Sequence, residues 1–242
     1  MVRESDYAKH SRIVLSDNEL NEFLKAGESS KAALQKDPHG RFRSWEHCYG
    51  FFSANRFNPD EETIDLLCLH LAFYLASWGM YRGSSFLFQK DYLFHRQAVQ
   101  LLLSHEWSDL WHPSATFLSQ SKNAQRIMDL SAKLNQIYMQ AAERERDLTD
   151  TLTTKILLGT LGCVPAYDIN FKKATRKLSR GLATYTANSV LTLARFYSEH
   201  EDAFEPLRLS CNQYGVDYPP MKILDMCLFT YGQQLAERGE KG

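Results

Sequence analysis

Residues 155–180 read KILLGTLGCVPAYDINFKKATRKLSR and contain the turn on which the fold of the chain depends. Glycines interrupt one helical run, and a second helical run follows. Six cations surround the single carboxylate of Asp168, although the whole chain has a formal net charge of −1. The start of a helix offers free N–H groups and the positive end of the helix dipole, and glycine lets an anion approach the backbone closely. The stretch therefore predicts a helix, turn, helix corner that binds phosphate.

The turn from Leu161 to Asp168 resembles the hairpin of helix-hairpin-helix DNA-binding elements in its length and its apolar framing. In those elements the backbone amides of the turn bind a DNA phosphate while the second helix packs behind them. Such hairpins commonly read Leu-Pro-Gly-Val-Gly, whereas residues 161–165 read Leu-Gly-Cys-Val-Pro and lack the second glycine. The resemblance makes Gly162 a candidate nucleic-acid-binding residue. The alternative is an ordinary helix corner in which Gly162 is a C-cap glycine.

Basic side chains beside the turn are a second feature of this stretch. Four of them are spaced three or four residues apart, which places them in one stripe on a helix: Lys173, Arg176, Lys177 and Arg180. A stripe that neutralises phosphates would make DNA binding salt-dependent. The candidate nucleic-acid contacts are Lys155, Lys172, Lys173, Arg176 and Lys177. The alternative is a solvated helix face whose cations pair with acids elsewhere.

Asp168 lies within this positive field, which favours its ionised form if the groups are close in space. A carboxylate in such a place stabilises positive charge that develops on a sugar, or orients an attacking water. Asp168 is therefore a candidate catalytic residue. The alternative is structural, because an acid in the first turns of a helix starting at Pro165 is also favoured by the helix dipole.

A second candidate site is the loop WGMYRGSS, which runs from Trp78 to Ser85. Its two glycines give the backbone freedom around Arg82, and Ser84 and Ser85 can cap the next helix while their N–H groups face an anion. The rings of Trp78 and Tyr81 are candidates to stack on an extruded base. All five residues are therefore candidate nucleic-acid contacts. The alternative is a turn between helices whose aromatic residues belong to the core.

The length of 242 residues suits a single helical domain over residues 1–242, or two lobes, 1–112 and 113–242, that share an interface. Helical periodicity recurs along the chain, and no alternating runs with hairpin turns occur at strand spacing. We therefore expect an all-α, compact multi-helix domain. The expected helices cover 16–36, a short segment around Trp45, 59–79, 86–103, 125–145, 149–159, a helix from Pro165, 187–200, 203–214 and 221–236.

Several features favour a cytoplasmic protein with no membrane partner. The apolar run from Leu66 to Met80 is shorter than the roughly 20 residues needed to cross a bilayer, so it predicts a buried helix. The N-terminus lacks the apolar segment and the cleavage site of a signal peptide. The five cysteines are far apart and include no CxxC pair, which is typical of reduced thiols used as small apolar residues. We expect no metal and no cofactor.

Two further patterns bear on function. Arg195 and His200 match the Arg-x4-His spacing of higher eukaryote and prokaryote nucleotide-binding (HEPN) ribonucleases, which are also helical. A polar residue usually follows the arginine in that family, and Phe196 follows it here.

Asp225 lies among apolar neighbours, so its carboxylate needs a partner or a changed pKa. It is a second candidate catalytic acid, or it bridges neighbouring helices.

Three motifs, WGMYRGSS, GTLGCVPAYD and PPMKILDM, lie between Trp78 and Met226. Together they resemble a family of bacterial helical proteins associated with anti-phage DNA glycosylases, which remove glucosylated hydroxymethylcytosine from phage genomes. The resemblance implies that the partner is DNA and that the N-glycosidic bond of a modified base is cleaved. It also implies that the nucleotide is extruded, stacks on Trp78 or Tyr81, and has its sugar cation stabilised by Asp168.

The chain departs from classical helix-hairpin-helix glycosylases at one place. Their catalytic aspartate lies on a later helix past the hairpin, and the corresponding stretch here reads LATYTANS, without a carboxylate. Asp168 or Asp225 would serve instead, or Lys155 or Lys172 would act as an amine nucleophile and add strand cleavage. Two other classes stay open: a HEPN-like ribonuclease and a non-catalytic nucleic-acid or protein adaptor.

Overall fold

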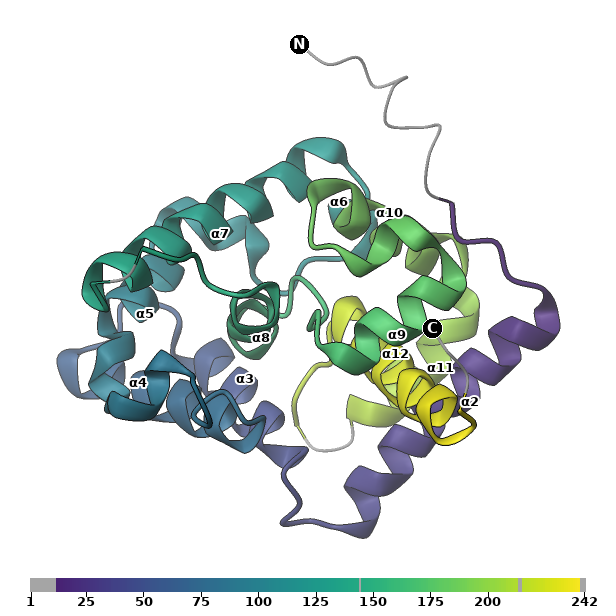
Figure 1. Cartoon of the computed structure of the whole chain (residues 1–242), viewed down its shortest axis with the longest axis horizontal. Helices are drawn as coiled ribbons and strands as arrows, with labels where there is room; N and C mark the ends of the chain where they lie inside the picture. The colour runs from purple at the N-terminus through teal and green to yellow at the C-terminus, as the bar shows by residue number, and fades with distance from the viewer. Residues whose placement is uncertain (1–11, 144, 213–214, 240–242) are drawn as a thin grey trace.

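A computed structural model describes residues 12–143, 145–212 and 215–239 (Figure 1). The regular structure of these residues is entirely helical and includes no strand, so the all-α fold is confirmed. The α-helices are α2 (Asp17–Lys36), α3 (Arg43–Asn55), α4 (Glu61–Ser77), α5 (Arg96–Leu103), α6 (Ala115–Leu118), α7 (Ser121–Ala141), α8 (Asp150–Thr160), α9 (Ile169–Leu178), α10 (Ala187–Glu199), α11 (Glu201–Cys211) and α12 (Pro220–Glu237). Short 3-10 helices are η1 (Phe86–Gln89), η2 (Tyr92–His95), η3 (His105–Leu110) and η4 (Arg180–Ala183). Tyr214, the expected end of one helix, lies outside the described residues.

Side-chain caps determine where several helices begin. Ser16 and Glu19 form a capping box at α2: the Ser16 hydroxyl accepts a hydrogen bond from the Glu19 amide, and the Glu19 carboxylate accepts one from the Ser16 amide (2.8 Å). Asp60 caps α4 and Thr149 caps α8. Because the first N–H groups of a helix have no partner inside it, these side chains stabilise the predicted starting positions.

The expected helices 86–103 and 59–79 differ from the structure, the first in its continuity and the second in its burial. The segment 86–103 is not one helix, because Lys90 is extended and Asp91 caps a separate turn, η2. Helix α4 is buried on one side only, and its other side exposes Leu66, Leu69 and Phe73. Within the described part of the chain, every helix is too short or too polar to cross a membrane.

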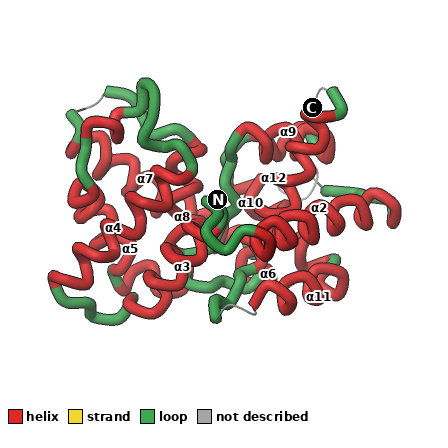
Figure 2. Tube along the Cα trace, turned by 90° about the horizontal axis from the view of Figure 1, so that it is seen from below, coloured by secondary structure: helices red, strands yellow, loops and turns green. Residues whose placement is uncertain are grey.

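The helices form two groups around one apolar core (Figure 2). One group contains α3, α4, α5, α7 and α8, and the other contains α2, α6, α9, α10, α11 and α12. Helix α12 packs against α2 and α9, while α10 contacts α7 of the first group. The groups do not follow the expected lobes 1–112 and 113–242, because α2 packs with α12, and α7 and α8 pack with α5 and α3. A division at residue 112 is therefore not confirmed.

Candidate active site

The connection between α8 and α9, residues 161–168, passes through the interior of the protein, and Leu161 to Tyr167 are buried. Gly162 has a φ of 68°, and its amide donates a hydrogen bond to the Leu157 carbonyl (2.9 Å), so it is the glycine that ends α8. A Cβ atom at this position would lie 2.5 Å from Pro219 Cγ. The expected exposed phosphate cradle at Gly162 is therefore wrong, because the residue is enclosed and its amide already has a partner.

The arrangement of α8 and α9 does not confirm a helix-hairpin-helix element. Helix α9 packs on α12 and η4, whereas α8 packs on α3, α4 and α7. The later amides of the connection also bond inside the protein. The Ala166 amide donates to Oδ1 of Asp225 (2.9 Å), and the Tyr167 amide donates to Oγ1 of Thr154 (2.9 Å). The connection therefore holds helices together, and the amides of Gly162, Ala166 and Tyr167 already have partners inside the protein.

Asp168 is the N-cap of α9, which begins at Ile169 and not at Pro165. Its Oδ1 accepts hydrogen bonds from the amides of Asn170 (3.1 Å) and Phe171 (3.0 Å). Its Oδ2 lies 3.3 Å from Nζ of Lys155. The structural alternative for this residue is thus observed. The same cap fixes the carboxylate so that its second oxygen faces a lysine.

Lys155 is the buried cation of the site. It is 3% exposed, and its Nζ lies 4.4 Å from the centre of the Trp78 ring. Burial lowers the pKa of Lys155, and the charges of Asp168 and Asp225 oppose that change. A buried lysine with a lowered pKa is suited to nucleophilic chemistry, because the uncharged amine is the reactive form. Lys155 is also a predicted nucleic-acid contact, and its enclosed side chain would meet a nucleic acid only inside the protein.

Asp225 reaches the same cluster from α12. Its Oδ1 accepts the hydrogen bond from Ala166, and its Oδ2 accepts one from Nζ of Lys222 (2.9 Å). Lys222 Nζ lies 4.9 Å from the centre of the Trp45 ring, so this second buried lysine also has an aromatic neighbour. Asp225 therefore bridges α12 and the connection after α8, which is one of the two roles expected for it.

Trp78 lies against Lys155 at the end of α4. Its ring makes edge contacts with Phe42 and Phe229, at centroid distances of 5.4 and 5.5 Å. This packing agrees with the alternative that Trp78 belongs to the core, since the side chains of Phe42 and Phe229 already surround its ring. Its Nε1 is nevertheless buried without a hydrogen-bond partner among the described residues. An unpaired indole N–H beside a buried lysine is a donor that an acceptor atom of a ligand would satisfy.

The remainder of the loop from Trp78 is more open. Arg82 and Ser84 are exposed, and Ser85 is half-buried and caps η1 through its hydroxyl (3.3 Å), as the sequence predicts. Gly79 and Gly83 have φ values of 75° and 61°, so both adopt the conformation that glycine favours. A residue with a side chain would adopt either conformation only at a cost.

A pocket of about 500 Å3 lies between this loop and residues 146–152, which lead into α8. Arg82 and Arg146 supply its cations. Leu152 also lines the pocket, and Lys155 follows it by about one helical turn. The Arg82 loop therefore faces the start of α8 and not the turn at Gly162. We refer to this space as the Arg82 pocket.

A hydrogen-bonded chain of three side chains anchors the loop. The Tyr81 phenol bonds to Nε2 of His95 (2.6 Å), and Nδ1 of His95 bonds to the Tyr138 phenol (2.6 Å). Because a neutral imidazole has one donor and one acceptor, one phenol donates to it and the other accepts from it. Tyr81 thus holds the loop and is not a free stacking surface. No sequence signal revealed this chain, since its members are 14 and 43 residues apart and share no motif.

The basic residues of α9 differ in their surroundings. Lys172 pairs with Asp150 (3.3 Å), and Lys173 is half-buried. Arg176 and Lys177 are exposed. The side chain of Arg180 lies outside the described residues. The alternative of cations paired with acids elsewhere is observed for Lys172, and none of the stripe residues lines the Arg82 pocket.

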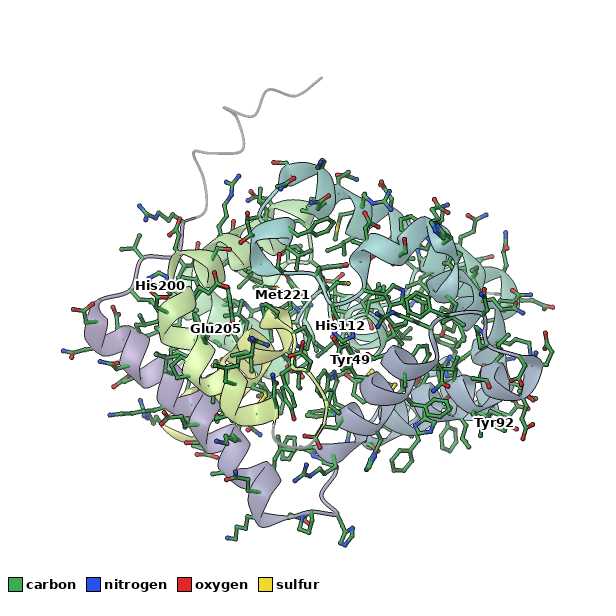
Figure 3. All side chains as sticks on the ribbon, turned by 180° about the vertical axis from the view of Figure 1, so that it is seen from behind. Tyr49, Tyr92, His112, His200, Glu205 and Met221 are labelled. Carbon is green, nitrogen blue, oxygen red and sulfur yellow. The ribbon has the colours of Figure 1, made fainter. Side chains whose placement is uncertain are left out.

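Arg195 and His200, the pair with the ribonuclease spacing, each bond to a different backbone carbonyl. Arg195 donates a hydrogen bond to the Ser119 carbonyl (3.4 Å), and Nδ1 of His200 donates to the Phe196 carbonyl (2.9 Å). Figure 3 shows His200 on a different part of the molecule from His112, whose Nδ1 bonds to the Tyr49 phenol (2.6 Å). Each histidine therefore has its own local partner.

The cysteines do not add a nucleophile to the site. All five are buried and free. Burial raises the pKa of Cys163 to about 12, so this thiol stays protonated near neutral pH. Among the residues that the structure describes, no group of three or more histidine, cysteine or acidic side chains is placed to hold a metal ion.

Comparisons with known proteins add no further assignment to this site. The chain matches no protein-family model, no curated protein and no solved structure.

Proposed function

We propose that this protein is a DNA glycosylase that removes a modified base, of the glucosylated hydroxymethylcytosine type, from phage DNA. The observation that carries the proposal is the meeting of three distant motifs at one buried lysine. The loop after α4 contributes Trp78 and the connection after α8 contributes Asp168, and both contact Lys155. Helix α12 contributes Asp225, which bonds to that connection and whose charge acts on the pKa of Lys155. Charged groups are expensive to bury, so a cluster of this kind is a functional-site candidate.

The chemistry that we propose for Lys155 is nucleophilic. Its uncharged amine attacks C1′ of the target nucleotide, and a C1′–Nζ bond forms as the C1′–N bond to the base breaks. The electrons of the broken bond leave with the base, which takes a proton from water. Asp168, 3.3 Å from the amine, accepts the proton that the new C–N bond releases. The sugar ring then opens: the C1′–O4′ bond breaks, O4′ takes a proton, and the nitrogen loses one, which gives an imine between C1′ and Nζ. Loss of a C2′ proton from this imine expels the 3′ phosphate and cleaves the strand.

Access to Lys155 requires the loop after α4 to move, because the lysine is 3% exposed. The Arg82 pocket is the entry that we propose, since it adjoins the turn of α8 before Lys155. Arg82 and Arg146 would pair with phosphates of the strand. An extruded base would displace Trp78 from the amine and accept a hydrogen bond from its unpaired Nε1.

The test uses three duplexes that contain unmodified, hydroxymethylated or glucosylated hydroxymethylated cytosine at one position. Each is incubated with the protein and then treated with alkali, which breaks the strand at abasic sites. We expect an alkali-labile product from the glucosylated duplex. Parallel samples with borohydride should trap a covalent complex between protein and DNA, because borohydride reduces the imine on Lys155.

Matched variants separate the two lysines that were candidates for the nucleophile. Lys155→Met should abolish trapping and turnover, whereas Lys172→Gln, which alters a more exposed lysine paired with Asp150, should retain both. Asp168→Asn keeps an oxygen for the α9 cap and should reduce the rate by about 100-fold or more, a typical contribution of a proton acceptor. Circular dichroism verifies that each variant is folded.

Two results would contradict different parts of the proposal, the glycosylase activity and the lysine nucleophile. The absence of an alkali-labile product from all three duplexes would remove the glycosylase activity. An alkali-labile product without trapping, and with Lys155→Met still active, would remove only the lysine nucleophile and leave Asp168 as the group that stabilises the sugar cation.

A further inference from the structure

A second pocket, of about 240 Å3, lies between the residues after α3 and the segment from α5 to Trp111. It shares no lining residue with the Arg82 pocket. Its lining includes a cation, two aromatic rings and two polar side chains: Arg56, Phe57, Trp111, Asn58 and Ser104. We refer to this space as the Arg56 pocket. Its volume is below the range of pockets that take drug-sized ligands, so its occupant must be small.

Arg56 is the cation of this pocket, and it lacks an acid. Its guanidinium carbon lies 4.7 Å from the centre of the Phe57 ring and 5.7 Å from that of Trp111. Nη1 donates to the Ser53 carbonyl (3.2 Å). No carboxylate of the described residues makes an ion pair with it, whereas several other arginines do: Arg12, Arg43, Arg96, Arg126 and Arg208. A planar guanidinium with open donors is suited to phosphate or carboxylate.

Polar and backbone features of the pocket also suggest a ligand. The Ser104 hydroxyl is buried and has no hydrogen-bond partner among the described residues. A buried polar group without a partner is destabilising by about 1–3 kcal/mol, so it calls for an explanation. Asn58 has a φ of 47°, and His112, next to Trp111, has a φ of 48°. Non-glycine residues rarely adopt this conformation, although asparagine and histidine do so more often than most, and functional sites are among the places where such strain occurs.

Aromatic surface completes the pocket. Phe57 is 75% exposed, and both Phe57 and Trp111 line the pocket beside Arg56. An exposed aromatic face next to an unpaired arginine is suited to a flat ring that carries an anion. We infer that the Arg56 pocket binds a single nucleotide, with its phosphate on the Arg56 guanidinium and its base stacked on Phe57. This inference does not depend on the proposed glycosylase activity.

The experiment is calorimetric titration of the full chain with dCMP, deoxycytidine, inorganic phosphate and a short single-stranded oligonucleotide. We expect saturable binding of dCMP, and weaker binding of deoxycytidine and of phosphate, because each offers only one of the two contacts. Arg56→Gln should weaken dCMP binding by about tenfold or more, the usual effect of losing a charge-assisted hydrogen bond. Phe57→Ala should weaken dCMP binding but leave phosphate binding unchanged.

The matched control is Arg41→Gln. Arg41 also lies near two aromatic rings, those of Phe42 and Trp78, each at 5.4 Å, but it does not line the Arg56 pocket. This variant should bind dCMP as the parent protein does. Oligonucleotide binding that falls with Arg56→Gln would assign the site to a nucleotide within a strand, and dCMP binding alone would assign it to a free nucleotide.

Three outcomes would overturn the inference. These are the absence of binding by both dCMP and the oligonucleotide, equal dCMP affinity in Arg56→Gln and the parent protein, or equal affinity for dCMP and phosphate. The last result would mean that the base makes no contact. Ser104→Ala is a conservative second variant, because it removes only a hydroxyl. It should weaken dCMP binding, and it serves as the test if Arg56→Gln fails to fold.

Discussion

The buried imidazole of His95 predicts a loss of stability on mild acidification. Burial lowers the pKa of His95 from 6.5 to about 4, and only Asp91 opposes this change. In the unfolded chain the imidazole takes up a proton near pH 6.5, whereas in the folded protein it stays neutral until about pH 4. The unfolded state therefore binds more protons across this interval, and stability falls as the pH drops through it. The difference between the two pKa values corresponds to about 3 kcal/mol of unfolding free energy.

Urea denaturation followed by circular dichroism at several pH values between 7.5 and 4 would measure this loss. The comparison protein is His95→Gln, because glutamine keeps a donor and an acceptor for the phenols of Tyr81 and Tyr138 but does not titrate. Burial also lowers the pKa of His70 and His112, and both proteins retain these contributions. The difference between the two pH profiles therefore isolates His95.

We expect the unfolding free energy of the parent protein to fall by about 3 kcal/mol more than that of His95→Gln over this range. Two parallel profiles would refute the reasoning, because they would mean that His95 titrates at the same pH in both states. A direct check is the NMR titration of its imidazole: a midpoint near 6.5 in the folded protein would exclude the buried, neutral form.

Four other substitutions have measurable consequences. Gly162→Ala combines a positive φ with overlap and should cost about 3 kcal/mol, whereas Gly83→Ala has a similar φ with open space and should cost about 1 kcal/mol; equal losses in thermal denaturation would contradict the buried corner. Gly232→Ala would overlap the Asn170 carbonyl and should cost about 2 kcal/mol, with faster proteolysis of α12 as the readout. Tyr81→Phe leaves a buried imidazole nitrogen unpaired and should cost about 1–3 kcal/mol; unchanged stability and unchanged hydrogen exchange in the loop would show that the bond contributes nothing.

Local sequence patterns predicted the class of the fold and much of its helical punctuation. The capping box at Ser16 and Glu19 and the C-cap interpretation of Gly162 are local, since each depends on residues within one or two turns. The break after Lys90 was missed because the apolar spacing continues across it. A single cap at Asp91 outweighed that spacing.

Tertiary packing decided the character of the candidate site. A lysine in a basic stretch suggests surface charge, and nothing in the sequence near Lys155 shows that Trp78 and α12 enclose it. The partners of His95 and Asp225 likewise come from other helices. The amino-acid sequence by itself determines where helices form, because helix formation depends on hydrogen bonds between near neighbours and on the periodic spacing of apolar residues. Burial and the pKa of a side chain depend on which distant surfaces meet, and only the packed structure decides that.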